Sequence, residues 1–181
     1  MLPMLDDILK TCATEWIKAK TQKKHPFRYF TLTTVSSNGH PQGRVVVLRN
    51  FDSQSFSFTV YTDARSEKIK ALAANPIAEL LFYDPRKMHQ IRVKAKCVLV
   101  EKSDALFRQQ HINAQKDYTT DLPPGTKIKS MDAVGYAADH HFTQLIFSAY
   151  EIESLRLKRP NHQRAVFEFQ NQQWIGSFQV P

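Results

Sequence analysis

A hairpin pattern occupies residues 29–50, which read YFTLTTVSSNGHPQGRVVVLRN. The first part, residues 29–35, is rich in threonine and aromatic residues, and residues 43–50 form a second run rich in β-branched residues. Between them, Ser36-Ser37-Asn38-Gly39 supplies turn residues. An Asn-Gly pair between two strand-forming runs is typical of a β-hairpin. The stretch therefore predicts two antiparallel strands.

The rest of the chain continues this pattern. Helical spacing predicts an amphipathic helix over about residues 3–20, a short helix from Ser66 that Pro76 stops, and a further helix over 104–113. Consecutive hairpins with a few peripheral helices are typical of a small antiparallel barrel, so we expect a mainly β protein that forms a single domain over residues 1–181. Strands are expected at 56–62, 77–83, 90–101, 145–157, 164–169 and 174–180, with turns at 51–55 and 170–172.

The composition limits the classes of protein to which the chain can belong. The chain has 181 residues and a formal net charge of +8, which invites polyanionic partners such as nucleic acid, phosphorylated ligands or a membrane surface. No apolar run approaches the roughly 18 residues of a membrane helix, and Asp6 and Asp7 interrupt the stretch where a secretory signal would be apolar. We therefore expect a cytoplasmic protein without a membrane segment. Cys12 and Cys97 lack metal-ligand spacing and are expected to be buried thiols, with no metal site.

Glycine usage limits how the protein can hold a phosphate. The chain has five glycines, and they do not cluster. Gly-rich phosphate loops need several glycines close together, because the backbone itself must approach the phosphate. Any phosphate is therefore expected to be held mainly by side chains.

Cationic and hydroxyl residues are concentrated in two segments, RVVVLR at 44–49 and TDARSEK at 62–68. Arg44 and Arg49 are an odd number of residues apart, so in one continuous strand they point to opposite faces, and one of them should face the interior or an interface.

Ser66 lies where a helix is predicted to begin. Backbone N–H groups, the positive end of the helix dipole, the Ser66 hydroxyl and Lys68 can converge there on a phosphate. The alternative is that Ser66 only caps the helix while Arg65 and Lys68 are solvated.

Both segments, their order and the strand between them resemble the pyridoxamine 5'-phosphate oxidase family. These are flavoproteins with a split β-barrel fold that bind FMN at a homodimer interface. The resemblance covers about residues 28–101, including Gln90, and returns at Arg164 and Trp174. The motif at 62–68 is most similar to a bacterial and plant branch of oxidase-related FMN-binding proteins of unassigned activity.

The resemblance implies a role for each matching position. It implies that Arg44 and Lys68 hold the FMN phosphate with the help of Ser66, and that Gln90 reaches the flavin ring from the partner subunit. It places Arg49 near the polar edge of the ring and near the substrate. The other cofactor-binding positions that it implies are Val45, Val46, Val47, Leu48, Tyr61, Thr62 and Arg164.

The chain departs from the oxidase pattern at several positions. Glu67 stands where the family has an arginine, and Arg65 is the candidate to replace that contact. Leu155 corresponds to a flavin-stacking tryptophan if one gap is allowed. The family's substrate-binding Arg-x-His reads Pro160-Asn161-His162, so only His162 remains as a substrate contact, and residues 111–130 lack a Ser-Arg-Pro signature that supplies further contacts.

The residues and the resemblance together predict a homodimeric, FMN-dependent oxidoreductase with an unidentified small-molecule substrate. No catalytic residue is assigned, and a related deazaflavin is the alternative cofactor. One alternative function is a non-enzymatic flavin carrier or sensor. Another is a basic β-barrel that binds nucleic acid through aromatic residues such as Tyr29, Phe56 and Phe58.

Overall fold

The computed structural model describes residues 4–181, apart from the side chains of residues 99 and 100. Helices cover α1 (Leu5–Thr21), α2 (Glu67–Ala74), α3 (Asp104–Arg108) and α4 (Ile112–Lys116), with short 3-10 turns at Pro26–Arg28 and Met131–Ala133. The strands are β1 (Tyr29–Val35), β2 (Pro41–Val47), β3 (Asn50–Asp52), β4 (Ser57–Asp63), β5 (Ile77–Asp84), β6 (His89–Glu101), β7 (Phe142–Arg156), β8 (Gln163–Gln170) and β9 (Gln173–Gln179).

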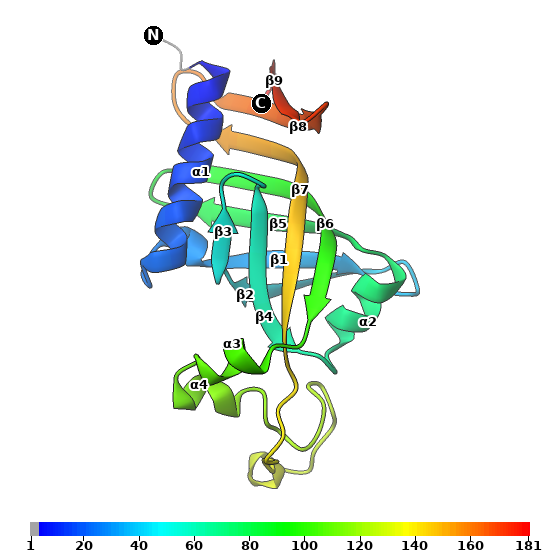
Figure 1. Cartoon of the computed structure of the whole chain (residues 1–181). Helices are drawn as coiled ribbons and strands as arrows, with labels where there is room; N and C mark the ends of the chain where they lie inside the picture. The colour runs from blue at the N-terminus through cyan, green and yellow to red at the C-terminus, as the bar shows by residue number, and fades with distance from the viewer. Residues whose placement is uncertain (1–3) are drawn as a thin grey trace.

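The strands form one curved antiparallel sheet that does not close, which is a split β-barrel (Figure 1). Neighbouring strands follow the order β2-β1-β5-β6-β7-β4-β3, while β8 and β9 extend the sheet from β7. This confirms the mainly β, antiparallel barrel that the hairpin patterns predict. In Figure 1, α1 lies along one side of the barrel, and α2, α3 and α4 lie at its lower end.

Strand β7 joins the two ends of the barrel. Its first half pairs with β4 and its second half with β8, while β6 pairs along most of its length. Register shifts between Lys94 and Ala95 and between Cys97 and Leu99 interrupt the β6–β7 ladder. Bulges of this kind bend a strand and increase its twist, so β7 can pass from one partner to the other.

Aromatic residues fill the barrel beneath α1. The Trp16 ring lies 4.9 Å from Phe58, 5.1 Å from Phe51 and 5.6 Å from Phe82. Cys12 and Trp16 are fully buried one helical turn apart, as the amphipathic pattern predicts. Among the described residues, none of the helices has the length and apolar character that crossing a membrane requires.

Several boundaries differ from the sequence predictions. The helix predicted over 3–20 is α1, and residue 3 lies outside the described residues. The single helix predicted over 104–113 is wrong: Ser103 accepts from the Leu106 N–H at 3.3 Å and His111 from the Asn113 N–H at 3.3 Å, so two caps start two short helices. Cys97 is only half-buried, because the bulge beside it breaks the strand's alternation.

The turn predicted at 51–55 begins as strand β3. Arg49 lies in the two-residue gap between β2 and β3, outside any strand. The alternation argument that relates Arg49 to Arg44 therefore does not apply, because the chain changes direction between them.

Candidate functional site

A cation–hydroxyl cluster, made of Arg44, Thr62, Ser66 and Lys68, lies where β4 leads into α2. The Lys68 ammonium donates to Thr62 Oγ1 at 2.8 Å and to Ser66 Oγ at 3.1 Å. The two hydroxyl oxygens are 3.4 Å apart, and both residues are buried. Arg44 comes from β2 and is near enough for its charge to lower the pKa of Lys68. The structure thus brings together four of the residues that the sequence singles out.

Arg44 enters this cluster from the core side of the sheet. In the β1–β2 register it pairs with Leu32, whose side chain is in the core. Its guanidinium donates to Thr34 Oγ1 at 2.7 Å, to the Leu32 carbonyl at 3.3 Å and to Gln42 Oε1 at 3.4 Å. All of these acceptors are neutral, so they orient the guanidinium without balancing its charge.

The cluster has an uncompensated positive charge. Burial lowers the pKa of Arg44 and of Lys68, and for Lys68 the charge of Arg44 adds to that effect, while Asp63 acts in the opposite direction. Neither cation forms an ion pair with a carboxylate in the part of the chain that the structure describes. Partly desolvated cations without counter-charges beside buried hydroxyls favour an anion with several acceptor oxygens.

Ser66 occupies the N-cap position of α2, but its side chain makes no capping hydrogen bond. The hydroxyl instead contacts Lys68 and Thr62. The alternative that Ser66 only caps the helix is therefore wrong. The first N–H groups and the dipole of α2 reinforce the preference of this corner for an anion.

Arg49 and Tyr61 lie together beside the cluster. The Arg49 guanidinium is 5.3 Å from the centroid of the Tyr61 ring, and Tyr61 packs 4.9 Å from Phe142. Tyr118 also reaches Arg49: burial raises the pKa of Tyr118, whereas the charge of Arg49 and a hydrogen bond to it act in the opposite direction. The sequence analysis missed Tyr118, since no motif marks it and it is distant in sequence from Arg49.

Some backbone hydrogen-bonding groups of residues 44–49 are paired within the chain, and others are available to a ligand. The N–H groups of Leu48 and Arg49 donate to the carbonyls of Arg28 and Thr59, each at 2.9 Å. Strand β2, in contrast, lies at one end of the sheet order, so one edge of Val45, Val46 and Val47 has no neighbouring strand within residues 4–181. This edge offers backbone contacts to a planar ligand. The side chain of Leu48 is buried in the core.

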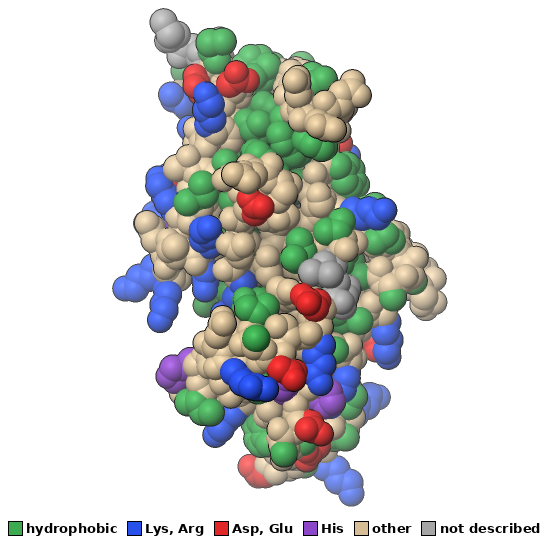
Figure 2. Space-filling view, viewed as in Figure 1, with side chains coloured by type: hydrophobic (Ala, Val, Ile, Leu, Met, Phe, Trp, Pro, Cys, Tyr) green, Lys and Arg blue, Asp and Glu red, His purple; other side chains and the backbone are tan. Residues whose placement is uncertain are grey.

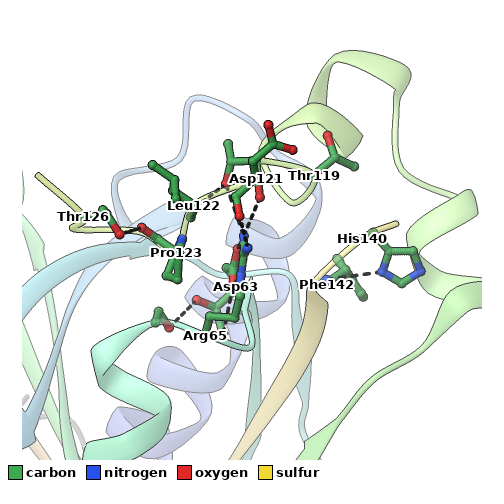
Figure 3. Close-up of polar contacts among 12 residues, drawn as sticks. Asp63, Arg65, Thr119, Asp121, Leu122, Pro123, Thr126, His140 and Phe142 are labelled. Atoms are coloured by element: carbon green, nitrogen blue, oxygen red, sulfur yellow. Dashed lines mark hydrogen bonds and ion pairs between the residues drawn. The ribbon is translucent and has the colours of Figure 1, made fainter. Parts of the chain in front are cut away.

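Arg65 does not join the cation–hydroxyl cluster. Its guanidinium forms a salt bridge with Asp63 at 2.7 Å and donates to the Thr120 carbonyl at 2.8 Å (Figure 3). Its donors are thus taken up by a carboxylate and by a neighbouring loop. Glu67, next in the motif after Ser66, is exposed and pairs with Lys70 at 3.0 Å.

A second group of predicted residues lies in one row across β6, β7 and β8. Gln90 pairs with Leu155, which in turn pairs with Arg164. The neighbours of Gln90 along β6, His89 and Ile91, are buried in the core, so Gln90 is on the outer face of the sheet.

Charged neighbours hold this row in place. Arg164 donates to Glu153 Oε2 at 2.7 Å, and Glu153 also pairs with Arg92 at 3.4 Å. His162 is exposed in the turn before β8, where its Nδ1 accepts from the Lys158 N–H at 3.1 Å.

The two groups are far apart within one chain. Tyr61 pairs with Gln144 on β7, whereas Gln90 pairs with Leu155, eleven residues further along the same strand. At about 3.3 Å per residue, on the order of 30 Å of strand separates them. Among the described residues, no hydrogen bond or ion pair joins Gln90 or Arg164 to the cation–hydroxyl cluster.

Comparisons with known proteins agree with this fold. Residues 9–101 match the family model described as "Pyridoxamine 5'-phosphate oxidase, FMN-binding domain". A pyridoxine/pyridoxamine 5'-phosphate oxidase from Actinobacillus succinogenes is 30% identical over 178 residues, which cover 89% of this chain and 83% of that protein. Residues 9–101 contain strands β1, β2 and β4, which frame the cluster, and all four residues of the cluster.

Two solved structures share the fold. A pyridoxamine 5'-phosphate oxidase-related, FMN-binding protein from Nostoc punctiforme superposes with a TM-score of 0.77 at 21% identity and full coverage of both chains. PhzG from Burkholderia lata, solved with tetrahydrophenazine-1-carboxylic acid, superposes with a TM-score of 0.81 at 17% identity, covering 100% of this chain and 98% of that one. At these identities the likeness establishes the fold. Together with the family match, it shows that the chain belongs to the FMN-binding pyridoxamine 5'-phosphate oxidase family.

Proposed function

We propose that the protein is a homodimeric, FMN-dependent oxidoreductase whose cation–hydroxyl cluster binds the phosphate of FMN. The observation that carries this proposal is the pair of cations, Arg44 and Lys68, which lie near two buried hydroxyls and form no ion pair with a carboxylate among the described residues. A phosphate monoester has close to two negative charges and three acceptor oxygens, which suits one guanidinium, one ammonium and the hydroxyls of Thr62 and Ser66. The residues present therefore fit the cofactor of the family.

Each part of the site has a distinct role in this proposal. FMN, when bound, supplies the redox chemistry through its ring system. The chain orients the cofactor through the cation–hydroxyl cluster and through the free edge of β2 at Val45–Val47. Arg49, held over Tyr61, supplies a positive charge that stabilises negative charge on the ring.

Dimerisation completes the site in this proposal. Gln90 and Arg164 make no hydrogen bond or ion pair with the cluster among the described residues, so the partner subunit is the proposed source of the Gln90 contact. The outer face that carries Gln90 also exposes apolar side chains, including Tyr29, Val45 and Tyr83 at 59%, 68% and 45% of their surface. Apolar residues of this size on an outer sheet face are typical of a protein interface. Gln90 of the partner subunit would then meet the flavin held by the first subunit.

The substrate differs, in this proposal, from that of the named oxidases. Pro160 replaces the arginine of the family's Arg-x-His, and His162 is exposed in a turn. Loss of a charge-assisted phosphate contact removes about 1.5 to 3 kcal/mol of binding. We therefore expect pyridoxamine 5'-phosphate to be a poor substrate. Aldehyde formation at saturating FMN measures this, and turnover equal to that of a dedicated oxidase would contradict it.

Nucleic-acid binding has less support than flavin binding. Phe58 is fully buried and Phe56 packs against Trp174 at 5.0 Å, so of the three aromatic residues named for that alternative only Tyr29, 59% exposed, offers a base-stacking surface. On the face drawn in Figure 2, Lys and Arg side chains are scattered and do not form a continuous stripe. A basic groove lined with exposed aromatic residues is what single-strand binding requires.

Flavin titration with a matched pair of lysine variants tests the proposal. Lys68→Ala should weaken FMN binding by about 1.5 to 3 kcal/mol, or roughly ten- to a hundredfold, because a charged hydrogen bond to phosphate is lost. Lys70→Ala is the control, since Lys70 is two residues away on α2 and pairs with exposed Glu67. FAD should bind much less well than FMN, because the chain has no Gly-rich pyrophosphate loop.

Two results would show that the site is misplaced. One is equal affinity for FMN and FAD, and the other is equal FMN affinity of the Lys68→Ala and Lys70→Ala proteins. Tight FMN binding without turnover of any substrate class would instead indicate a flavin carrier or sensor.

A further inference from the structure

The turn at residues 62–68 presents two sets of side chains in two directions. Thr62, Ser66 and Lys68 contact one another in the cation–hydroxyl cluster. The intervening Asp63 and Arg65 instead pair with each other and reach the loop at residues 118–122 (Figure 3). One turn thus connects the expected phosphate site to a loop that is more than fifty residues away in sequence.

Arg65 forms an extensive set of contacts with this loop. Its Nε and Nη2 donate to the two Asp63 carboxylate oxygens at 3.1 and 2.7 Å, which is a forked, bidentate arrangement. The same guanidinium donates to the Thr120 carbonyl at 2.8 Å, to Thr120 Oγ1 at 3.2 Å and to the Asp121 carbonyl at 3.2 Å. Asp63 is buried, and its hydrogen bond raises the pKa of Arg65.

Backbone hydrogen bonds hold the base of the same loop. The Ala64 N–H donates to the His141 carbonyl at 2.7 Å, and the His141 N–H donates to the Tyr118 carbonyl at 2.8 Å. Backbone bonds also pair the following residues with residues 135–137, since the Asp121 N–H donates to the Gly135 carbonyl at 3.0 Å. The Arg65 guanidinium adds contacts to the carbonyls of Thr120 and Asp121. Arg65 therefore ties the part of the loop that follows Tyr118 to the turn at residues 62–68.

Tyr118 carries the effect of this loop to Arg49. Its side chain is buried and its ring packs edge-on against Phe142 at 5.0 Å, and Phe142 packs 4.9 Å from the Tyr61 ring. Arg49 in turn lies over the Tyr61 ring. A continuous series of contacts therefore leads from Arg65 through residues 118–121 to the guanidinium of Arg49.

We propose that Arg65 is a positioning residue which, with Asp63, holds residues 118–122 so that Tyr118 keeps Arg49 in place at the flavin ring. Arg65 thus shapes the environment of the ring and does not bind the phosphate. The proposal rests on the proposed function, since it takes Arg49 to lie beside the flavin. It corrects the expectation that Arg65 replaces the arginine missing at Glu67.

The test compares two flavins that differ only in phosphate. We would measure the ratio of FMN affinity to riboflavin affinity for Arg65→Ala, Arg65→Lys and Asp63→Asn, with Lys68→Ala as the phosphate reference and Glu67→Ala as the control within the same turn. The ratio should fall about tenfold or more for Lys68→Ala, because a charged hydrogen bond to phosphate is lost. The ratio should stay unchanged for the Arg65 and Asp63 variants, because these substitutions should change the affinities for FMN and riboflavin equally.

Two further readouts report on the loop itself. Trypsin should cleave the Arg65→Ala protein faster at Lys127 and Lys129, both exposed in the segment that follows residues 118–122, with and without flavin. The visible circular dichroism of bound flavin should change in Arg65→Ala and Asp63→Asn but not in Glu67→Ala. Arg65→Lys should rescue only part of both effects, because one ammonium cannot copy the forked contact with Asp63. If Arg65→Ala does not fold, Arg65→Lys and Asp63→Asn still test the proposal.

Distinct outcomes overturn the proposal. A fall in the FMN-to-riboflavin ratio of Arg65→Ala as large as that of Lys68→Ala would make Arg65 a phosphate ligand. Unchanged cleavage and an unchanged flavin spectrum would show that backbone bonds alone hold the loop. If neither the parent protein nor any variant binds flavin, the proposed function fails, while cleavage of the apoprotein still tests whether Arg65 holds the loop.

Discussion

Ser66 illustrates how one side chain can leave its usual structural role for a place in a binding site. It stands at the N-cap of α2, yet its hydroxyl contacts Lys68 at 3.1 Å and makes no capping bond. Ser103, in contrast, caps α3 through the Leu106 N–H. The same residue type at the same helix position therefore has two different partners.

We predict that Ser66→Ala weakens FMN binding with little effect on folding. The loss should be about 1.5 kcal/mol or more, the lower end for a hydrogen bond to a charged group, because the phosphate loses a hydroxyl donor. Flavin titration and chemical denaturation of the apoprotein measure the two effects. Ser103→Ala is the control and should cost about 0.5 to 2 kcal/mol of stability without changing FMN affinity. A reversed pattern, with stability lost in Ser66→Ala and FMN affinity kept, would contradict this assignment.

Lys68 should make FMN binding sensitive to alkaline pH. Burial and the charge of Arg44 lower the pKa of this ammonium, so in the apoprotein it loses its proton below the usual lysine value of about 10.4. Only the charged form attracts phosphate, and therefore FMN affinity should fall as the pH rises toward the usual lysine value. Titrations across this range should show the fall in the parent protein and a flatter profile in Lys68→Ala. A parallel decline in both proteins would assign the pH dependence to another group.

At the scale of elements, a buried polar contact lies where β6 and β7 pack beneath α1. His89 on β6 is 2% exposed, and its Nε2 is 2.8 Å from Ser154 Oγ on β7. Cys12 on α1 is fully buried and hydrogen-bonds to Ser154. Burial, reinforced by the charge of Arg156, lowers the pKa of His89 to about 4. The folded protein therefore holds this imidazole neutral.

Acid should destabilise the folded protein where α1 packs on the sheet, because the buried His89 there resists protonation. In the unfolded chain His89 takes up a proton near pH 6.5, whereas in the folded chain it resists protonation to about pH 4. The unfolded state binds more protons between these values, so stability falls as the pH drops through that window, by up to roughly 3 kcal/mol. Denaturation of the parent protein and of His89→Gln at several pH values measures the difference. The same slope in both proteins, or an equal change in the exposed-residue control His162→Gln, would refute it.

At the scale of the whole molecule, one chain holds the two groups of predicted site residues at opposite ends of β7. Tyr61 and the cation–hydroxyl cluster lie at the first half of β7, and the row of Gln90, Leu155 and Arg164 crosses its second half. In the proposed site, the cluster of one subunit and the partner subunit's Gln90 hold the same flavin. Cofactor binding and assembly should therefore be linked.

Added FMN should tighten the dimer. Whatever binds the dimer better than the monomer stabilises it by mass action, by about 2.7 kcal/mol per site at a free concentration a hundred times Kd. Sedimentation at graded FMN concentrations measures the association constant. Gln90→Ala should weaken FMN less than Lys68→Ala, because it removes a neutral contact. A monomer that binds FMN tightly, or association that is insensitive to FMN, would contradict a shared site.

Local sequence patterns were sufficient for much of the fold. The Asn-Gly turn with its flanking strand-forming runs predicts β1 and β2, and the spacing of Cys12 and Trp16 predicts the buried face of α1. These features depend on neighbouring residues, whose turn chemistry and periodicity can be read directly from the chain. The gathering of Thr62, Ser66 and Lys68 follows for the same reason, since all three lie within one turn.

Only the tertiary structure decided which distant residues meet. Strand register and the path of a long loop determine three of these contacts. They bring Arg65 to Thr120, they bring Tyr118 near Arg49, and they place Gln90 and Arg164 in one row. The change of direction at Arg49, which ended the strand alternation predicted from Arg44, belongs with them. No local pattern encodes such contacts, because a one-residue change in register moves a side chain to the other face of the sheet.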